Sequence, residues 1–441
     1  MPDYIIVGAG ITGLTCAYRL KQRGASVLVL EEANLAGGKI LTERVNGYLL
    51  ESGPNSLRIE NRETVDLIES VGLTARAVEA SPNAKKRFIL RNGRWVQAPV
   101  GPIQAVTTPL FSFGGKLRVL GEIFTSPCTA RDETIESYFL RHFGRELYEQ
   151  AADPFVTGIY AGDPTKLSVR HSFKVFWQLD QQYGSMIRGM LMRKKDPNRV
   201  KPRIISFPNG LGELIERIRE ELAGDIQFHK EALTLTHGAT GYTLRSASES
   251  FTAPNIILAL PAHSTAPLIE SIAISLAAEL AAVDYPPIAV AYLGFREDQF
   301  LTKIEGFGGL IPSKEGRSIL GAIYSSSNFA GRAPDGHVLL TVLAGGARNR
   351  AVMGWSHDQI LQNAEREVRA LFQSNGAPVF RHARLWKRAI PQYNVGYDSV
   401  LNAISAAESA NPGLHFVGNY RGGIAMGACI KSATELAASL V

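Results

Sequence analysis

Residues 1–14 read MPDYIIVGAGITGL, and this stretch decides the fold. The apolar run Tyr4–Val7 leads directly into Gly8, Gly10 and Gly13, and a helix-compatible segment, LTCAYRLKQRG, follows. A strand, a tight glycine turn and a helix in this order bring the free N–H groups of the first helical turn to the glycines. Because those donors favour negative charge, the pattern predicts that residues 8–13 bind the pyrophosphate of a dinucleotide.

A second apolar strand is expected at residues 26–30, and it ends in Glu31 and Glu32. An acid placed about 20 residues after the glycines can accept a hydrogen bond from a ribose hydroxyl and would repel a 2′-phosphate. Glu31 is the better candidate because it follows the strand directly, whereas Glu32 also fits a solvated acid. At this point the dinucleotide is either NAD or FAD.

The composition is that of a globular protein of two or three domains, with 441 residues, 45% of them hydrophobic and 20% charged. The formal net charge of +6 suits an anionic ligand or an acidic membrane surface. The three cysteines, Cys16, Cys128 and Cys429, lie far apart and predict reduced thiols without a metal site. With no leader or spanning segment evident, we expect a cytoplasmic protein that at most lies on the membrane.

The sequence pattern in the middle of the chain predicts a change from mixed strands and helices to a mainly helical stretch, from about residue 96 to residue 203. A hairpin is expected over residues 85–98, with its turn at Asn92-Gly93. Apolar residues recur every four positions in residues 132–150, which predicts a helix with Asp132 as its N-cap. The helical stretch ends in the basic segment 188–203, and another amphipathic helix is expected at 358–372.

The end of the chain repeats the strand, turn and helix of its beginning. Residues 414–419 read LHFVGN, a strand that Arg421, Gly422 and Gly423 separate from a final helix. Two such units suit a two-part cofactor, with one helix N-terminus for the pyrophosphate and the other for the flavin ring. The second unit therefore favours FAD, and it predicts that both ends of the chain share one sheet.

Several longer segments resemble the flavin-dependent amine oxidases and, within that group, the oxygen-dependent protoporphyrinogen and coproporphyrinogen oxidases. They include GGKILT (37–42), ESGPNS (51–56), AGDPTKLS (161–168), AGGARNR (344–350) and AIPQYNVG (389–396). The resemblance implies oxidation of protoporphyrinogen IX to protoporphyrin IX with non-covalent FAD, in which six electrons pass to oxygen and three hydrogen peroxide molecules form. Oxidation of coproporphyrinogen III is the alternative. An amine oxidase or a non-catalytic flavin-binding protein is a more distant one.

The resemblance also implies an α/β fold with three parts. A discontinuous Rossmann-like FAD-binding domain of the amine-oxidase type takes residues 1–77, 204–262 and 405–441. A mixed-sheet substrate domain takes 78–95 and 263–404, and a helical subdomain takes 96–203.

Carried over position by position, the resemblance implies backbone contacts between the flavin nucleotide and the two strand–turn–helix units. Glu31 would bind the adenosine ribose, Ala232 the adenine through its backbone, and Lys39 would lie near the phosphates. Trp386 would lie near the flavin ring. The remaining cofactor positions are Gly8, Ala9, Gly10, Ile11, Thr12, Gly13, Glu32, Gly38, Gly53, Pro54, Asn55, Ser56, Gly418, Ile424, Ala425 and Met426.

For the substrate, the resemblance implies an arginine that anchors a propionate and apolar side chains that hold a pyrrole ring. The arginine is Arg87; the other positions are Gly158, Leu310, Ile323 and Leu343. Read without the family, Arg87 belongs to a charged run with Lys85 and Lys86, and the three apolar residues are core. Two departures stand out: Leu35 replaces a frequent arginine, and Leu343 a frequent aromatic residue. No side chain is assigned as a catalytic acid or base, and no metal ligand is expected.

The expected partners are a porphyrinogen and oxygen, with a membrane surface and ferrochelatase as further candidates. Apolar residues 109–113 and the basic segment 188–203 fit a patch that lies on anionic lipid. A substrate lid or a dimer surface fits them equally well. The basic run lacks interleaved aromatic residues, which argues against nucleic acid. The oligomeric state is either monomer or homodimer.

Overall fold

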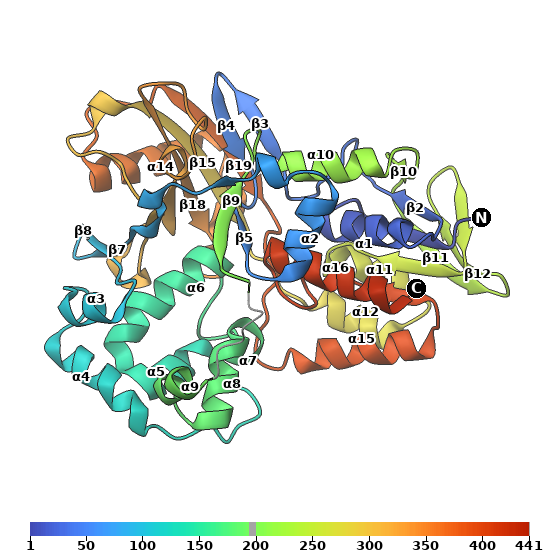
Figure 1. Cartoon of the computed structure of the whole chain (residues 1–441), viewed down its shortest axis with the longest axis horizontal. Coiled ribbons are helices and arrows are strands. Elements are labelled where there is room, and N and C mark those ends of the chain that lie inside the picture. Colours follow the sequence, from blue (N-terminus) through green and yellow to red (C-terminus); the bar gives the residue numbers. More distant parts are fainter. Residues whose placement is uncertain (194–199, 441) are drawn as a thin grey trace.

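The computed structural model describes residues 1–193 and 200–440 and divides into three regions (Figure 1). A five-stranded parallel sheet with helices carries both ends of the chain. A seven-stranded sheet with one long helix forms the second region, and the helices between residues 102 and 192 form the third.

The five-stranded sheet confirms that the two ends of the chain fold together. Its strand order is β10-β2-β1-β14-β20, and every neighbouring pair is parallel. Strands β1 and β2 come from the first 30 residues, whereas β20 comes from the last 30. The bounds are β1 Tyr4–Val7, β2 Val27–Leu30, β10 Ile226–Gln227, β14 Asn255–Leu258 and β20 Leu414–Phe416.

Both faces of this sheet are covered, which explains its nearly continuous apolar strands. One hydrophobic core joins the sheet to helices α1 (Ile11–Gln22), α2 (Arg62–Ser70), α10 (Gly212–Glu221) and α16 (Met426–Leu440). A second core lies on the other side of the sheet. It contains an antiparallel sheet and three helices: β11 Thr234–Gly238, β12 Gly241–Arg245, β13 Ser250–Ala253, α11 Ala262–Ile269, α12 Ile274–Ala281 and α15 Asp398–Ala410.

The seven-stranded sheet is mixed, with the order β19-β15-β18-β17-β16-β7-β8. Helix α14 (His357–Phe372) packs its apolar side on one face, as its periodicity predicts. The hairpin β7–β8 is confirmed, and Asn92 and Gly93 both take the positive φ angles that its two-residue turn requires. The strands are β7 Arg87–Arg91, β8 Arg94–Gln97, β15 Ile288–Arg296, β16 Gly308–Leu310, β17 Gly321–Tyr324, β18 His337–Gly345 and β19 Phe380–Trp386.

Short elements connect the two sheet regions. They are the hairpin β3 (Thr42–Val45) with β4 (Tyr48–Glu51), the three-stranded sheet β5 (Leu57–Ile59), β9 (Arg203–Ser206) and β6 (Val78–Glu79), and helix α13 (Ser325–Asn328). The predicted division into three sequence ranges stays an interpretation. Helix α15 runs across the boundary expected at residue 405.

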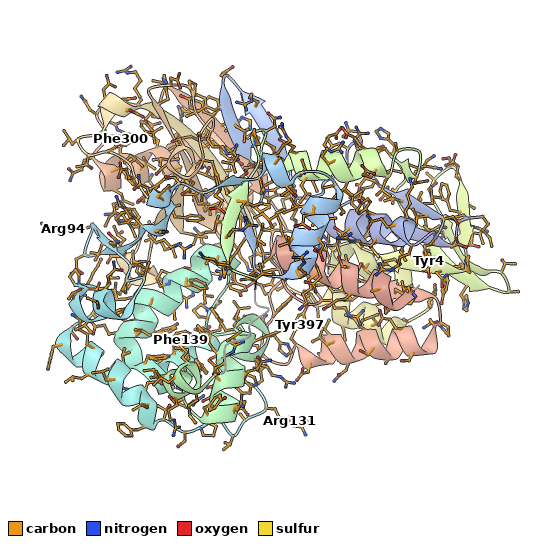
Figure 2. The ribbon with its side chains drawn as sticks, viewed as in Figure 1. Tyr4, Arg94, Arg131, Phe139, Phe300 and Tyr397 are labelled. Atoms are coloured by element: carbon orange, nitrogen blue, oxygen red, sulfur yellow. The ribbon has the colours of Figure 1, made fainter. Side chains whose placement is uncertain are left out.

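The third region consists of α3 (Pro102–Thr107), α4 (Phe113–Gly121), η3 (Glu122–Phe124), α5 (Ile135–Leu147), η4 (Tyr148–Ala152), α6 (Asp153–Tyr160), α7 (Val169–Ser172), α8 (Lys174–Tyr183) and α9 (Met186–Met192). Phe139 lies inside this region, whereas Tyr397 lies at its border with the helices that cover the five-stranded sheet (Figure 2). The predicted helix at 132–150 is present, but the N-cap prediction is wrong. Thr134 accepts from Ser137 N, while Asp132 accepts from the Ser168 hydroxyl.

The described residues contain no helix that is long and apolar enough to cross a membrane.

Candidate active site

The glycine turn after β1 leaves room for a ligand at the N-terminus of α1. A Cβ at Gly13 would overlap the carbonyl oxygen of Gly8, so helix and strand pack closely only because residue 13 is glycine. A Cβ at Gly10, in contrast, would meet nothing within 4 Å. No side chain caps the helix, and its first turn has no acid. This combination of open space and helix N–H groups suits an anion.

Glu31 lies against this turn, as the sequence predicts. Its carboxylate accepts from Ala9 N at 2.7 Å and from Ala33 N at 3.0 Å. Glu32 is exposed. The backbone N–H of Lys230 donates to the Glu31 carbonyl at 2.8 Å, which brings the segment leading to Ala232 to the same edge. Of the two acids, the structure therefore places Glu31 at the predicted nucleotide edge.

The second strand–turn–helix unit lies beside the first. Helices α1 and α16 pack against each other, and both follow strands of one parallel sheet, so their N-termini lie at the same edge. Gly422 and Gly423 have φ angles of +100° and +140°, which permit the sharp entry into α16. Ile424, Ala425 and Met426 are therefore presented at that edge next to residues 8–13.

The turns at residues 37–39 and 51–56 meet at a third point of this edge. Gly53 touches the Lys39 backbone, because a Cβ there would overlap the Lys39 carbonyl oxygen. The Lys39 ammonium donates to the Arg388 and Ala389 carbonyls, at 2.7 Å each. Burial lowers the pKa of Lys39 to about 8. A Cβ added at Gly38 would lie 3.4 Å from the Gly10 Cα, so this turn packs directly against the glycine turn of residues 8–13.

Trp386, the last residue of β19, joins the seven-stranded sheet to these turns. Its indole Nε1 donates to the Ser52 carbonyl at 2.7 Å. The Lys39 ammonium lies 5.8 Å from its ring centroid, and the Arg384 guanidinium lies over the same ring at 4.7 Å. Three segments that are far apart in the sequence thus converge at one place.

Leu310, Ile323 and Leu343 share one face of the seven-stranded sheet. Leu310 and Leu343 both pair with Gly321, and Ile323 is two residues beyond Gly321, so all three side chains point the same way. The residues of the opposite parity pack towards α14. Gly158, in α6, touches Leu310, because a Cβ there would overlap the Leu310 side chain. Four of the five predicted substrate residues therefore come together.

Arg87 begins β7 and pairs in register with Gly308. Its guanidinium lies 5.3 Å from the Phe307 ring centroid. Burial and the nearby Arg58 both lower the pKa of Arg87. Within residues 1–193 and 200–440, Arg87 has no ion-pair partner, whereas its neighbour Lys86 pairs with Glu305 at 3.0 Å. The structure thus leaves Arg87 available for a ligand, unlike Lys86.

Two of the predicted cofactor residues and one of the predicted substrate residues line a shared recess. Asn55 and Ser56 line it from the turn after β4, and Ile323 lines it from the sheet. The other lining residues are Leu49, Glu51, Phe307, Ser325, Asn328, Phe329 and Arg332. Four of its lining residues are apolar, and the buried charges of Glu51 and Arg332 also face it, so the recess links the turn after β4 to the sheet face of Ile323.

The family model that matches this chain is that of the flavin-containing amine oxidoreductases, and it matches residues 11–441. The chain belongs to this family. The open space at Gly10 and the N–H groups of the α1 N-terminus fit the pyrophosphate of FAD, and Glu31 lies at the same edge. The protein is therefore an FAD-dependent oxidoreductase.

Full-length relatives and solved structures agree with this membership. The chain is 32% identical to the mitochondrial protoporphyrinogen oxidase of Nicotiana tabacum, over 98% of this chain and 93% of that protein. It is 26% identical to coproporphyrinogen III oxidase of Bacillus subtilis, over 97% and 95%. A crystal structure from Exiguobacterium sp. 255-15, provisionally described as a protoporphyrinogen oxidase, matches with a TM-score of 0.84 at 25% identity, covering 99% and 98%.

Cys429 is the fourth residue of α16 and is unsuited to a covalent bond with the cofactor. Its thiol is buried, and burial raises its pKa to about 11. The sulfur lies 3.7 Å from the Gly423 carbonyl oxygen. A thiol with so little thiolate is a poor nucleophile, which agrees with non-covalent FAD.

Sequence reasoning assigned no role to three buried polar groups of this oxidoreductase. They are Arg332 in the recess, His142 in the helical region, and the Arg348–Asp153 ion pair beside α6. Arg348 belongs to AGGARNR, one of the segments that carry the family resemblance, so the sequence did indicate that this segment has a structural or functional role. The distant partners Asp153 and Ser313 were not visible from spacing.

Proposed function

We propose that this protein oxidises protoporphyrinogen IX to protoporphyrin IX with oxygen, releasing three hydrogen peroxide molecules. The main support is that the face bearing Leu310, Ile323 and Leu343 ends at Trp386, beside the turns at Lys39 and Gly53. A flat apolar substrate on this face lies next to the cofactor edge. Relatives at 32–33% identity over nearly the whole chain are protoporphyrinogen oxidases.

FAD, held at the glycine turn of residues 8–13 and at the α16 N-terminus, would supply the electron-accepting chemistry of this mechanism, with oxygen as the final acceptor. The chain's own residues bind, orient and shield the macrocycle. The apolar side chains of β16, β17 and β18 hold a pyrrole ring and exclude water, while Arg87 pairs with a propionate. Because positioning can supply most of the rate enhancement, no general base is required from a side chain.

Coproporphyrinogen III is the second candidate, because the Bacillus subtilis relative oxidises it by name. Its four carboxylates would require more cations than Arg87. The purified protein should be mixed with each porphyrinogen without oxygen, and bleaching of the flavin absorbance recorded, followed by product fluorescence on aeration. Faster bleaching by protoporphyrinogen supports the proposal. Bleaching by coproporphyrinogen alone supports the second candidate, and bleaching by a primary amine alone contradicts both.

Replacing Arg87 with alanine is expected to raise KM for the porphyrinogen about tenfold with little change in kcat, the effect of losing one charge-assisted hydrogen bond. An anchor that pairs with the substrate equally before and during the reaction affects binding only. Steady-state kinetics measure both constants. Lys85→Ala is the matched control, since Lys85 is exposed and lies two residues away. An unchanged KM in Arg87→Ala would remove the anchor from the mechanism.

The same proposal includes a membrane-facing surface, which suits a sparingly soluble product that passes on to ferrochelatase. Exposed apolar side chains gather around α4, η3 and α9: Phe113, Leu117, Leu120, Phe124, Met190, Leu191 and Met192. We call these residues the apolar helical surface. Element η3 contacts both α4 and α9, so they form neighbouring parts of one region.

Two details of the predicted patch need revision. Leu110 is fully buried, so residues 109–113 do not all face outwards, although Phe113 is 78% exposed. Within the basic segment 188–203, residues 194–199 lie outside the described residues. Of its other cations, Arg188 donates to the Thr125 carbonyl, whereas Arg193 is exposed.

Replacing Phe113 and Phe124 together with glutamate is expected to reduce sedimentation with anionic vesicles by about tenfold or more, because burial of each phenylalanine contributes about 1.5–3 kcal/mol. Kinetics with detergent-solubilised substrate should not change. Leu301, 85% exposed on the sheet region, provides the control Leu301→Glu. If the double variant instead dissociates a dimer in light scattering and still binds vesicles, the surface is a subunit interface.

A further inference from the structure

Two family-typical segments and the residues that follow β16 meet at the two ends of α6, the helix that carries Gly158. At the first residue of α6, Asp153 accepts from Arg348 Nη1 at 2.6 Å. The same Nη1 lies 2.7 Å from the Ser313 hydroxyl oxygen, and Arg348 Nε lies 3.2 Å from Asp163 Oδ1. Arg348 belongs to AGGARNR, Asp163 to AGDPTKLS, and Ser313 follows β16.

The group at Asp153 is nearly closed to solvent and fully paired. Ser313 donates its backbone N–H to Asp153 Oδ2 at 2.7 Å and its hydroxyl to Oδ1 at 3.0 Å. Asp153 is 4% exposed, while Arg348 is half-buried. Because Arg348 is neutralised by Asp153 and Asp163, it is not a free anchor for a substrate carboxylate. Its role is therefore structural: it connects the start of α6 at Asp153 with Asp163 and Ser313.

The other end of α6 is held by the same stretch of chain. Ala347 N donates to the Ala161 carbonyl at 2.8 Å, directly beside Arg348. Ala161 has a φ of +50°, a left-handed conformation that ends the helix. Gln392 Nε2 also donates to the Tyr160 carbonyl at 2.9 Å. Residues 347–348 therefore grip α6 at its beginning and at its end.

Between these two points, α6 faces the substrate side of the sheet. Gly158 touches the Leu310 side chain, and Leu310 is three residues before Ser313. The distance between α6 and the face of Leu310, Ile323 and Leu343 is thus fixed by the contacts at the helix ends. A flat ring has to be held to within a fraction of an ångström to transfer a hydride efficiently.

We propose that Arg348 is a positioning residue that, by clamping α6 at Asp153, holds Gly158 against Leu310 and so sets the position of α6 beside the sheet face on which the tetrapyrrole ring binds. The inference rests on the proposed function and names a residue for substrate fit. It assigns Arg348 no contact with substrate or cofactor.

The test compares Arg348→Leu with Arg350→Leu in the FAD-loaded protein. Arg350 is two residues away in the same segment and pairs with Asp284 at the surface, so it is a matched control for loss of one arginine and one ion pair. The readouts are flavin content per protein, Kd for protoporphyrin from quenching of tryptophan fluorescence, and KM and kcat with protoporphyrinogen.

We expect Arg348→Leu to keep its flavin and to bind protoporphyrin about 10- to 100-fold more weakly, because the hydrogen bonds to the Asp153 charge are lost. Arg348→Lys should recover part of the affinity, since an ammonium still pairs with Asp153. Arg350→Leu should match the wild type. Porphyrin affinity within about twofold of the wild type in flavin-loaded Arg348→Leu, or an equal loss in Arg350→Leu, would overturn the proposal.

A second variant keeps the test decisive if Arg348→Leu does not fold. Ser313→Ala retains the ion pair and removes one neutral hydroxyl, and we expect about threefold weaker porphyrin binding with unchanged flavin content. No change in this variant would count against the clamp. A wild-type protein that binds neither porphyrin nor porphyrinogen would instead contradict the proposed function, which separates the two failures.

Discussion

Replacing Gly13 with alanine is expected to give a colourless protein without oxidase activity. A Cβ at residue 13 would overlap the Gly8 carbonyl oxygen and approach the Ala259 side chain at 3.1 Å. The α1 N-terminus would have to move away from β1, and with it the N–H groups that hold the pyrophosphate. Overpacking of this kind costs about 1–3 kcal/mol of stability even where neighbouring side chains can move. Here the neighbour is the Gly8 backbone, which cannot move without displacing the turn.

The measurement is the visible flavin absorbance of the purified variant and its Kd for added FAD. We expect affinity to fall by at least about 100-fold, or about 3 kcal/mol. Gly354→Ala is the control, because Gly354 is exposed and a Cβ there would meet nothing within 4 Å. A yellow Gly13→Ala protein with the wild-type Kd would show that the turn tolerates a side chain, and that the nucleotide is held elsewhere.

The cofactor half of the molecule could be predicted because its signals are local. Gly8, Gly10, Gly13 and Glu31 are 23 residues apart at most, and strand, turn and helix geometry links them directly. The second unit was predictable for the same reason. The sequence also favoured Glu31 over Glu32, and the structure agrees, since Glu31 accepts a hydrogen bond from Ala9 N whereas Glu32 is exposed.

The substrate side was less accessible to sequence reasoning, because its residues meet through strand register. Leu310, Gly321 and Leu343 lie in one row because they pair across three neighbouring strands. The alternation of residues within each strand does not show which residues of the next strand they pair with. The role of Asp132 was wrongly predicted because Thr134, two residues on, is also a capping residue type, and the sequence does not show which of the two begins the helix. Buried ion pairs such as Arg348–Asp153 join residues 195 positions apart and leave no local pattern.

Replacing His142 with leucine is expected to destabilise the helical region while leaving FAD bound. His142 is fully buried between two carboxylates, with Nδ1 2.7 Å from Glu122 Oε1 and Nε2 3.0 Å from Asp180 Oδ1. Removing the imidazole takes the positively charged partner away from the buried carboxylates of Glu122 and Asp180. Breaking a buried ion pair in this way lowers the free energy of unfolding by about 3–5 kcal/mol. The cost falls on η3, α5 and α8, which carry the three residues, and not on the five-stranded sheet.

The effect should depend on pH in a direction that the pKa shifts define. Burial by itself would lower the pKa of His142, but the carboxylates of Asp180 and Glu122 outweigh burial and raise it, despite the nearby charge of Arg141. The stabilisation is therefore complete below the unfolded value of about 6.5 and is lost as pH rises through the raised folded value. The pKa of Asp180 is lowered to about 2 by its hydrogen bonds, which outweigh burial. Its contribution is therefore present above the unfolded value of about 3.9 and is lost as pH falls through 2.

Hydrogen exchange of α5 and α8 at pH 6 and pH 9, in wild type and in His142→Leu, measures this directly. At pH 6 the variant should exchange much faster than the wild type, and the difference should be smaller at pH 9, because the wild-type imidazole loses its proton as pH rises through its raised pKa. Visible flavin absorbance should stay the same in both proteins, and His357→Leu, at an exposed position, should behave as wild type. A difference of equal size at both pH values would mean that His142 stabilises the region by packing against Tyr138 and not by its charge.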